Sequence, residues 1–287
     1  MKIGFISPAS HVVYEDIKNA INYFENQGHK IVLSKNIYKQ ERFMAGSDEE
    51  RLSDLHDMFA DKSVDFIIAT RGAYGSPRLL DKIDYELIKQ NKKGFIGLSD
   101  VTALSLAMYK MAGLSSYTGM VIKSDFKDET LPPLLKQSLN HALNHQKQSF
   151  KDLEIYNKGK AEGILVGGNL TMIMSLMGTP YEVDFQDKIL FIEEIGEEPF
   201  RVDRMINQLR LANVFNKIKG LIIGDFTVKL SKDKLDGTLD EVFYEQFKHL
   251  NIPIINNFLN GHIKEKYLLK IGAKIFLDCV NGEIHEM

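Results

Sequence analysis

The feature that most constrains the fold is a short apolar run that turns, through a single serine, into a helix. Residues 94–97 read Gly-Phe-Ile-Gly, and an apolar run between glycines is typical of a buried strand. Residues 101–111 have the apolar spacing of an amphipathic helix, which Gly113 is expected to end. Ser99 at the corner would present its hydroxyl beside the backbone N–H groups that begin with Asp100, as in a nucleophile elbow. Serine is also a favoured helix N-cap, and this stretch alone favours the cap.

Composition narrows the class of protein. At 287 residues the chain is long enough for two domains, and its net charge of −3, with lysines spread along the sequence, predicts no nucleic-acid partner. No signal peptide and no apolar stretch of transmembrane length are recognisable, so we expect a cytoplasmic protein with no membrane partner. Cys279 is the single cysteine, which excludes an internal disulfide and a multi-cysteine metal site. Its alternating surroundings predict a small core residue.

The first part of the chain alternates strand signals with helix signals. Strand-like runs cover residues 1–7, 30–33 and 64–69, and residues 12–27 have helical spacing of apolar side chains. A strand–helix–strand order is the unit of a parallel sheet with helices on its faces. The sequence therefore predicts an α/β fold.

The chain changes character at about residue 160, where short strands separated by glycine turns begin. We expect an N-terminal α/β domain at 1–125, a linker at 126–159 and a C-terminal domain at 160–287. The linker contains His141 and His145, four residues apart in a polar helical stretch. Because no HExxH motif or third ligand accompanies them, a solvated helix face is the favoured interpretation and no metal site is predicted.

A glycine-rich loop, residues 70–77, follows the third strand. Open α/β sheets bind ligands at the carboxyl ends of their strands, and glycines allow a backbone N–H to approach a ligand closely. The loop matches neither GxGxxG nor the P-loop, so a phosphate cradle is weakly supported. It could supply an oxyanion donor opposite Ser99, or it could be an ordinary turn, which is favoured in isolation.

Two further candidates follow buried strands in the second half of the chain. The apolar run 189–192 ends on Glu193, a carboxylate that is costly to bury without a partner. His262 lies in a later loop, and histidine is the side chain whose proton moves near neutral pH. Serine hydrolysis needs a base and an acid that orients it, so Ser99, Glu193 and His262 are candidates for one site. With eight histidines in the chain, such a set also arises by chance.

Seven short motifs, in this order and spacing, resemble the LD-carboxypeptidase family of serine peptidases. That family includes murein tetrapeptide carboxypeptidases and microcin C immunity proteins, and the resemblance covers nearly the whole chain. The motifs are Met44-Ala45-Gly46-Ser47-Asp48-Glu49-Glu50-Arg51, Arg71-Gly72-Ala73-Tyr74-Gly75, Gly97-Leu98-Ser99-Asp100, Gly167-Gly168-Asn169-Leu170, Phe191-Ile192-Glu193-Glu194, Phe200-Arg201-Val202-Asp203-Arg204 and Gly261-His262.

The resemblance implies a catalytic triad. Ser99 would be the nucleophile, His262 the general base and Glu193 the residue that orients it. The oxyanion would be held by backbone N–H groups, those of Asp100, Gly72 and Ala73. The reaction would be acyl transfer without a cofactor or a metal.

The resemblance also implies a fold and an assembly. We expect a Rossmann-like (flavodoxin/glutaminase-like) N-terminal domain, a smaller β-rich C-terminal domain, and a homodimer. The sequence departs from the family at Ala73, where glycine is usual, at Leu98, where tyrosine is common, and at Glu194, where aspartate is common. Ala73 matters most, because its Cβ would be strained if the loop needs a positive φ.

The substrate implied by the resemblance is an amide between an L-configured centre and a D-amino acid, as in murein tetrapeptide, whose terminal D-alanine would be released. Arg71 and Tyr74 are the predicted substrate-binding residues, with Arg71 suited to a free carboxylate or, equally, to pinning its own loop. One alternative is a microcin C-type immunity hydrolase acting on an aminoacyl-nucleotide amide. The other is a non-catalytic two-domain binding protein. A cysteine-dependent amidotransferase is excluded because the elbow has no cysteine.

Overall fold

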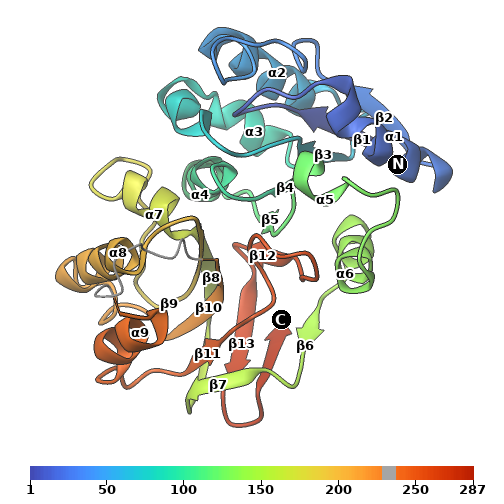
Figure 1. Ribbon diagram of the computed structural model, residues 1–287. Coiled ribbons are helices and arrows are strands. Elements are labelled where there is room, and N and C mark those ends of the chain that lie inside the picture. Colours follow the sequence, from blue (N-terminus) through green and yellow to red (C-terminus); the bar gives the residue numbers. More distant parts are fainter. Residues whose placement is uncertain (228–236) are drawn as a thin grey trace. The chain divides into compact units, whose positions relative to one another are not determined.

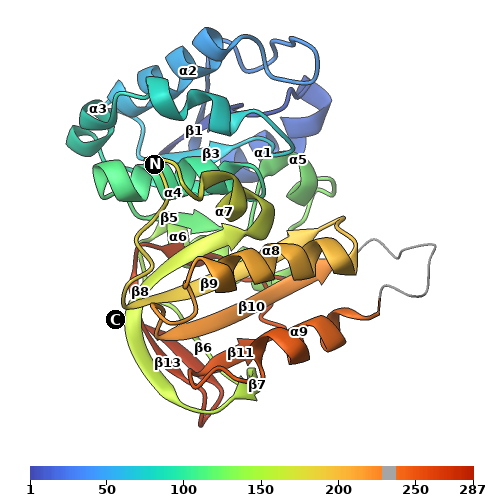
Figure 2. The ribbon, with the colours of Figure 1, turned by 90° about the vertical axis from the view of Figure 1, so that its left-hand side faces the viewer.

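The chain forms two compact units, shown as a ribbon in Figures 1 and 2. The computed structural model describes residues 1–227 and 237–287. Unit 1 comprises Met1–Gln146, Leu176–Val183 and Lys264–Gly272, and unit 2 comprises Lys147–Ser175, Asp184–Ile263 and Ala273–Met287. The interval 126–159 that the sequence suggests as a linker falls across the boundary, since the helix within it belongs to unit 1 and its two short strands to unit 2.

Unit 1 is built on a six-stranded sheet in the order β12-β5-β4-β3-β1-β2. The strands from β1 to β5 are parallel, and β12 adds to the edge by pairing antiparallel with β5. The parallel part therefore has the order 2-1-3-4-5 of flavodoxin-like folds, which confirms the predicted fold class. The strands are β1 (Lys2–Ile6), β2 (Lys30–Leu33), β3 (Phe66–Ala69), β4 (Gly94–Gly97), β5 (Ser116–Thr118) and β12 (Leu269–Ile271).

Helices cover both faces of this sheet, which explains why its central strands are apolar runs and do not alternate. On one face, side chains of α1, α5 and α6 join the core, and Phe5 of β1 packs edge-on against Phe24 of α1 at 6.0 Å. On the other face, Phe95 of β4 stacks with Phe59 of α2 at 6.4 Å. The helices are α1 (Tyr14–Asn26), α2 (Asp48–Ala60), a 3₁₀ helix (Ser76–Lys82), α3 (Tyr85–Gln90), α4 (Val101–Ala112), α5 (Ile122–Asp125) and α6 (Pro133–Leu143).

Unit 2 is β-rich, as expected, with an eight-stranded sheet in the order β6-β14-β13-β8-β9-β10-β11-β7. Its centre, from β8 to β11, is parallel, and antiparallel strands flank it on both sides. The helices α8 and α9 lie on one face of the sheet (Figure 2). The elements are β6 (Ser149–Phe150), β7 (Glu154–Asn157), β8 (Lys160–Asn169), α7 (Leu170–Leu176), β9 (Lys188–Ile195), α8 (Pro199–Leu211), β10 (Gly220–Thr227), α9 (Leu239–Phe247), β11 (Ile254–Asn256), β13 (Lys274–Asp278) and β14 (Glu283–Glu286).

The fold confirms the prediction for Cys279 and corrects the one for His141 and His145. Cys279 is fully buried, as expected for a core residue, and burial raises the pKa of its thiol to about 12. His145 follows α6 and does not share its face with His141, and its ring stacks on Phe66 at 6.0 Å, so the predicted common helix face is wrong. Among the described residues, no helix combines the length and apolar character that crossing a membrane requires.

Candidate active site

Ser99 occupies the turn between β4 and α4 in a left-handed conformation, with φ of 65°. This conformation costs a residue with a Cβ about 1–2 kcal/mol, and such strain is concentrated at functional sites. The residue that caps α4 is Asp100, which makes no side-chain capping hydrogen bond to the helix. The helix-cap interpretation of Ser99 is therefore wrong, and the local geometry is that of a nucleophile elbow.

The loop after β3 packs directly against this elbow. A Cβ added to Gly72 would lie 3.0 Å from the Ser99 Cβ and 3.3 Å from the Asp100 nitrogen, so a side chain there would push the elbow away by a few tenths of an ångström. The Gly72 carbonyl accepts a hydrogen bond from the Ser10 N–H at 3.2 Å. Ala73 has φ of 73°. This conformation is strained for alanine because of its Cβ, and the glycine usual at this position in the family would adopt it without strain. The loop and the elbow thus form one tightly packed backbone surface.

Asp100 contributes more to this surface than its backbone N–H. Its carboxylate accepts hydrogen bonds from the Gly75 N–H at 3.2 Å and the Ser76 N–H at 2.8 Å, and its carbonyl accepts one from the Ser76 hydroxyl at 2.7 Å. Burial raises the pKa of this carboxyl, and the two N–H donors oppose that rise. The motif around Ser99 predicts a role only for the Asp100 N–H, and no local pattern indicates the role of its side chain.

The two predicted substrate-binding residues also lie on this loop. Arg71 donates from Nη1 to the His11 carbonyl at 3.0 Å, so it holds the loop that follows β1. Tyr74 is 45% exposed, and its ring packs edge-on against Phe43 at 5.5 Å. This hydrogen bond supports the interpretation that Arg71 pins its own loop. A guanidinium has five N–H groups, so Arg71 can also donate to a ligand.

In unit 2, the end of β9 brings Glu193 to His262. The Glu193 Oε2 lies 2.8 Å from the His262 Nδ1, and the glutamate side chain is fully buried. Burial raises the pKa of Glu193, while the hydrogen bond and the charge of His262 oppose that rise. A carboxylate at Nδ1 fixes the imidazole with its proton on that nitrogen, which leaves Nε2 free to act as a base.

The neighbouring Glu194 has a different environment. Its carboxylate accepts hydrogen bonds from the Asn169 amide at 2.9 Å, from the Thr171 N–H and hydroxyl at 2.8 Å each, and from the Ile195 N–H at 2.8 Å. Four donors satisfy this buried carboxylate and fix the start of α7. Glu194 thus has a structural role, and of the two glutamates it is Glu193 that hydrogen-bonds to the histidine.

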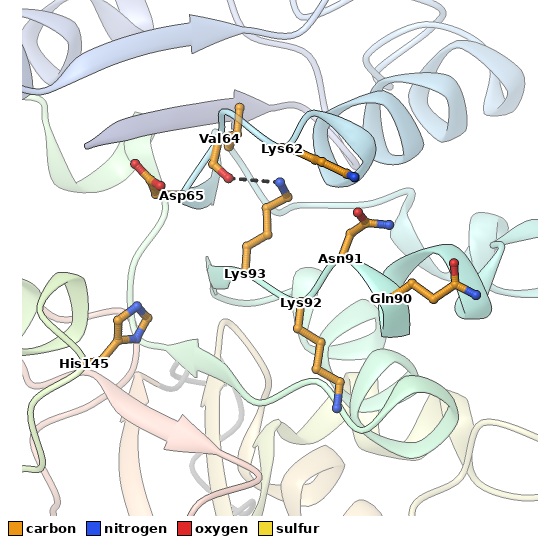
Figure 3. A pocket seen from close by; sticks show the side chains of 8 residues that line it. All are labelled: Lys62, Val64, Asp65, Gln90, Asn91, Lys92, Lys93 and His145. Atoms are coloured by element: carbon orange, nitrogen blue, oxygen red, sulfur yellow. Dashed lines mark hydrogen bonds between the residues drawn. The ribbon is translucent and has the colours of Figure 1, made fainter.

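A hollow of about 410 Å³ lies at the amino ends of β3 and β4 in unit 1, whereas Ser99 follows the carboxyl end of β4 (Figure 3). It is basic, but the Lys93 ammonium donates to the Val64 carbonyl at 2.9 Å and the Lys92 ammonium to the Gly113 carbonyl at 2.8 Å. Its lining residues are Lys62, Val64, Asp65, Gln90, Asn91, Lys92, Lys93 and His145. Because Ser99 follows the carboxyl end of β4, this hollow is remote from the elbow.

Comparison with known proteins shows to which family the chain belongs. Residues 3–119 match the LD-carboxypeptidase N-terminal domain and residues 162–277 match the LD-carboxypeptidase C-terminal domain. The chain belongs to the LD-carboxypeptidase family. It is therefore a serine-type LD-carboxypeptidase, a hydrolase, as the resemblance of the motifs implied. The two matched regions coincide with the parts that carry the elbow and the Glu193–His262 pair.

Individual LD-carboxypeptidases and their relatives align over almost the whole chain. The probable murein peptide carboxypeptidase of Bacillus subtilis is 34% identical over 95% of this chain and 87% of its own length. The crystal structure of the muramoyltetrapeptide carboxypeptidase from Oxalobacter formigenes has a TM-score of 0.90 and 30% identity, over 99% of this chain and 97% of that one. The microcin C7 self-immunity protein MccF of Escherichia coli is 26% identical over 98% of this chain and 93% of its own length.

Proposed function

We propose that this enzyme hydrolyses the L,D-amide bond of murein tetrapeptide and releases the terminal D-alanine, as a step in cell-wall recycling. The observation that carries the proposal is Ser99 in its left-handed elbow with Gly72 packed against it. The relatives named as murein peptide and muramoyltetrapeptide carboxypeptidases support the choice of substrate. The hydrogen bond between Glu193 and His262 supplies a base of the kind that a serine nucleophile needs.

In the proposed mechanism, His262 takes the Ser99 proton at Nε2 as the hydroxyl attacks the scissile carbonyl. Glu193 holds the Nδ1 proton and stabilises the imidazolium that forms. The tetrahedral oxyanion accepts hydrogen bonds from the N–H groups of Asp100 and of the Gly72–Ala73 loop. The imidazolium then protonates the leaving D-alanine nitrogen. Water, deprotonated by His262, hydrolyses the acyl-enzyme and returns Ser99 to its starting state.

We assign recognition of the substrate carboxylate to Arg71, with Tyr74 beside it. Arg71 lies on the loop that packs on Ser99, and a guanidinium can bind a carboxylate through two parallel N–H bonds. One of its nitrogens is occupied by the His11 carbonyl, which orients the group. Tyr74 is exposed and rests on Phe43, so its ring is positioned to contact a peptide.

The test is mass spectrometry of murein tetrapeptide incubated with wild type and with Ser99→Ala. We expect wild type to remove one alanine and Ser99→Ala to be slower by about 10⁴-fold or more, because the nucleophile is lost. Release of alanine by both proteins at similar rates would exclude Ser99 as nucleophile. No release by wild type would reject murein tetrapeptide as the substrate.

A second substrate class is favoured by one observation, the similarity of MccF over nearly the full chain. In this alternative the same residues cleave an aminoacyl-nucleotide amide. An aminoacyl sulfamoyl adenosine offered in the same assay separates the two, since cleavage of this compound and not of tetrapeptide would establish the alternative.

We also propose that the enzyme is a homodimer and acts in the cytoplasm, where recycled muropeptides are small soluble substrates. The dimer is the assembly that the resemblance of the motifs to the family implies. Light scattering on the purified protein measures its mass against the 32.7 kDa chain. Fractionation of the source cells tests the location.

A further inference from the structure

A buried arginine of α2 reaches the glycine-rich loop that follows β3. Arg51 is 1% exposed, and its Nη1 donates to the Pro8 carbonyl at 2.7 Å and to the Gly75 carbonyl at 2.8 Å. Its Nη2 pairs with Asp48, which Arg78 binds from outside through two hydrogen bonds of 2.8 Å. Removing a guanidinium from water is costly, and an apolar side chain would fill the same space at lower cost.

The two backbone polar groups of Gly75 contact side chains of opposite charge. Its carbonyl meets the Arg51 cation, while its N–H donates to the Asp100 carboxylate at 3.2 Å. The next N–H, of Ser76, donates to the second oxygen of the same carboxylate at 2.8 Å. Gly75 has φ of 138°, a conformation that residues with a side chain rarely adopt, and a Cβ there would lie 2.9 Å from the Arg51 Nη1 and displace the end of that side chain.

This arrangement lies next to the atoms that would hold the oxyanion. Asp100 follows Ser99 directly, and its own N–H is one proposed donor. The N–H groups of Gly72 and Ala73 are the other proposed donors. Ala73, which has the strained φ, lies two residues before Gly75. Strain of this kind persists only where surrounding contacts over-determine the backbone. The contacts that do so here are those of Arg51 and Asp100, together with the Ser10 N–H on the Gly72 carbonyl.

We propose that Arg51 and Asp100 form an ionic clamp on the Gly75 peptide that sets the position of the oxyanion-binding loop relative to Ser99. The proposal rests on the proposed function, because it assigns both side chains as positioning residues of that site. Since the oxyanion develops only after substrate has bound, in the transition states and the tetrahedral intermediate between them, the clamp should affect kcat and leave ground-state binding nearly unchanged.

The variants are Asp100→Asn, which keeps shape but turns an N–H donor toward one of its two N–H partners, and Arg51→Met, which keeps length without charge. We expect kcat on murein tetrapeptide to fall at least tenfold in each, with KM changed less than threefold. The second-order rate of Ser99 labelling by a fluorophosphonate should fall by a similar factor. Binding of the tripeptide product, measured by calorimetry, should be unchanged.

Ser47→Ala is the matched control. The Ser47 hydroxyl accepts the Glu50 N–H and caps the same helix that carries Arg51, without contacting Gly75. It should lower Tm while kcat stays within twofold of wild type. A loss of kcat in Ser47→Ala equal to that in the clamp variants would show that α2 stability alone is responsible and would overturn the clamp.

The remaining outcomes are also decisive. Wild-type kcat and labelling rate in a folded Asp100→Asn would overturn the proposal, and so would a rise in KM at constant kcat. If Arg51→Met does not fold, Asp100→Asn decides alone. If wild type is labelled at Ser99 but releases no alanine, the proposed substrate is wrong, and the labelling rates still test the clamp independently.

Discussion

At the scale of single residues, Ala73 carries a backbone angle that glycine would adopt without strain. Its φ of 73° costs about 1–2 kcal/mol, and the added chain entropy of glycine offsets about 0.5–1 kcal/mol. We therefore expect Ala73→Gly to raise the unfolding free energy by about 0.5–1 kcal/mol, measured by urea denaturation. Ala103→Gly, inside α4, is the control and should lower it by about 1 kcal/mol or more. Equal losses in both variants would show that Ala73 is unstrained.

The same loop shows what a sequence can and cannot indicate about single residues. The strand, the corner serine and the helix are local, so they were predictable from residues 94–113. That stretch alone nevertheless favoured a helix cap for Ser99, and the elbow was inferred only from motifs elsewhere in the chain. The sequence shows that alanine replaces the usual glycine at position 73, but it does not show that φ is positive there. Arg51 lay inside a recognised motif, yet its partners Pro8 and Gly75 are 43 and 24 positions away. Contacts at such separations follow from tertiary packing and leave no local pattern.

At the scale of elements, the end of β9 holds an acid in an apolar setting. Because burial raises the pKa of Glu193 above its unfolded value, the native state binds the extra proton, and stability falls as pH rises from about 4.3 through the folded pKa. Glutamine does not ionise, so Glu193→Gln should not lose stability in this way as pH rises. Urea denaturation from pH 4 to 8 should therefore show the variant gaining stability relative to wild type as pH rises above the unfolded pKa. A difference independent of pH would contradict a raised pKa.

The activity of Glu193→Gln should change in the opposite direction. An amide can turn its NH₂ toward the His262 Nδ1 and place the imidazole proton on the wrong nitrogen, so we expect kcat on murein tetrapeptide to fall by about 10³-fold or more. A stable but inactive variant would identify Glu193 as a group kept for catalysis at a cost in stability.

The end of β13 shows the reverse shift. Asp278 accepts hydrogen bonds from the Lys160 ammonium at 2.8 Å and the Val280 N–H at 3.0 Å, and these partners lower the pKa of its carboxyl to about 2. A lowered pKa gives stability that is present above about pH 3.9 and is lost as pH falls toward 2. We expect Asp278→Asn to be less stable than wild type at pH 7, with the difference shrinking between pH 4 and 2. A constant difference would exclude the ionised carboxylate as its source.

At the scale of the whole molecule, the sequence indicated two parts but not how the chain divides between them. Strand and helix periods placed most of the parallel strands of unit 1 and strand β9 of unit 2, since periodicity is a local property. The segment Lys264–Gly272 lies within the predicted C-terminal domain 160–287, yet it belongs to unit 1, where β12 pairs with β5. The chain enters unit 1 at Lys264, directly after the loop that carries His262. Edge pairing between distant strands is decided by tertiary contacts, so no local pattern predicts it.

Two ion pairs fasten this returning segment to unit 1, and their different burial leads to a final prediction. Lys266 is 2% exposed and lies 2.7 Å from the Asp125 Oδ1, whereas Lys264 is 77% exposed and lies 3.3 Å from the Asp128 Oδ2. Lys266→Met would leave a buried carboxylate without its cation and should lower the unfolding free energy by about 3 kcal/mol or more. Lys264→Gln, on the same segment, should change it by less than about 1 kcal/mol.

Urea denaturation measures both variants, and hydrogen exchange of the β5 and β12 amides locates the effect. Faster exchange at both strands in Lys266→Met would show that the ion pair secures the strand that returns to unit 1. Because this strand begins seven residues after His262, loosening it should also lower kcat on murein tetrapeptide. If Lys266→Met and Lys264→Gln were equally stable, the buried pair would not hold the segment, and the hydrogen bonds of β12 to β5 would have to hold it unaided.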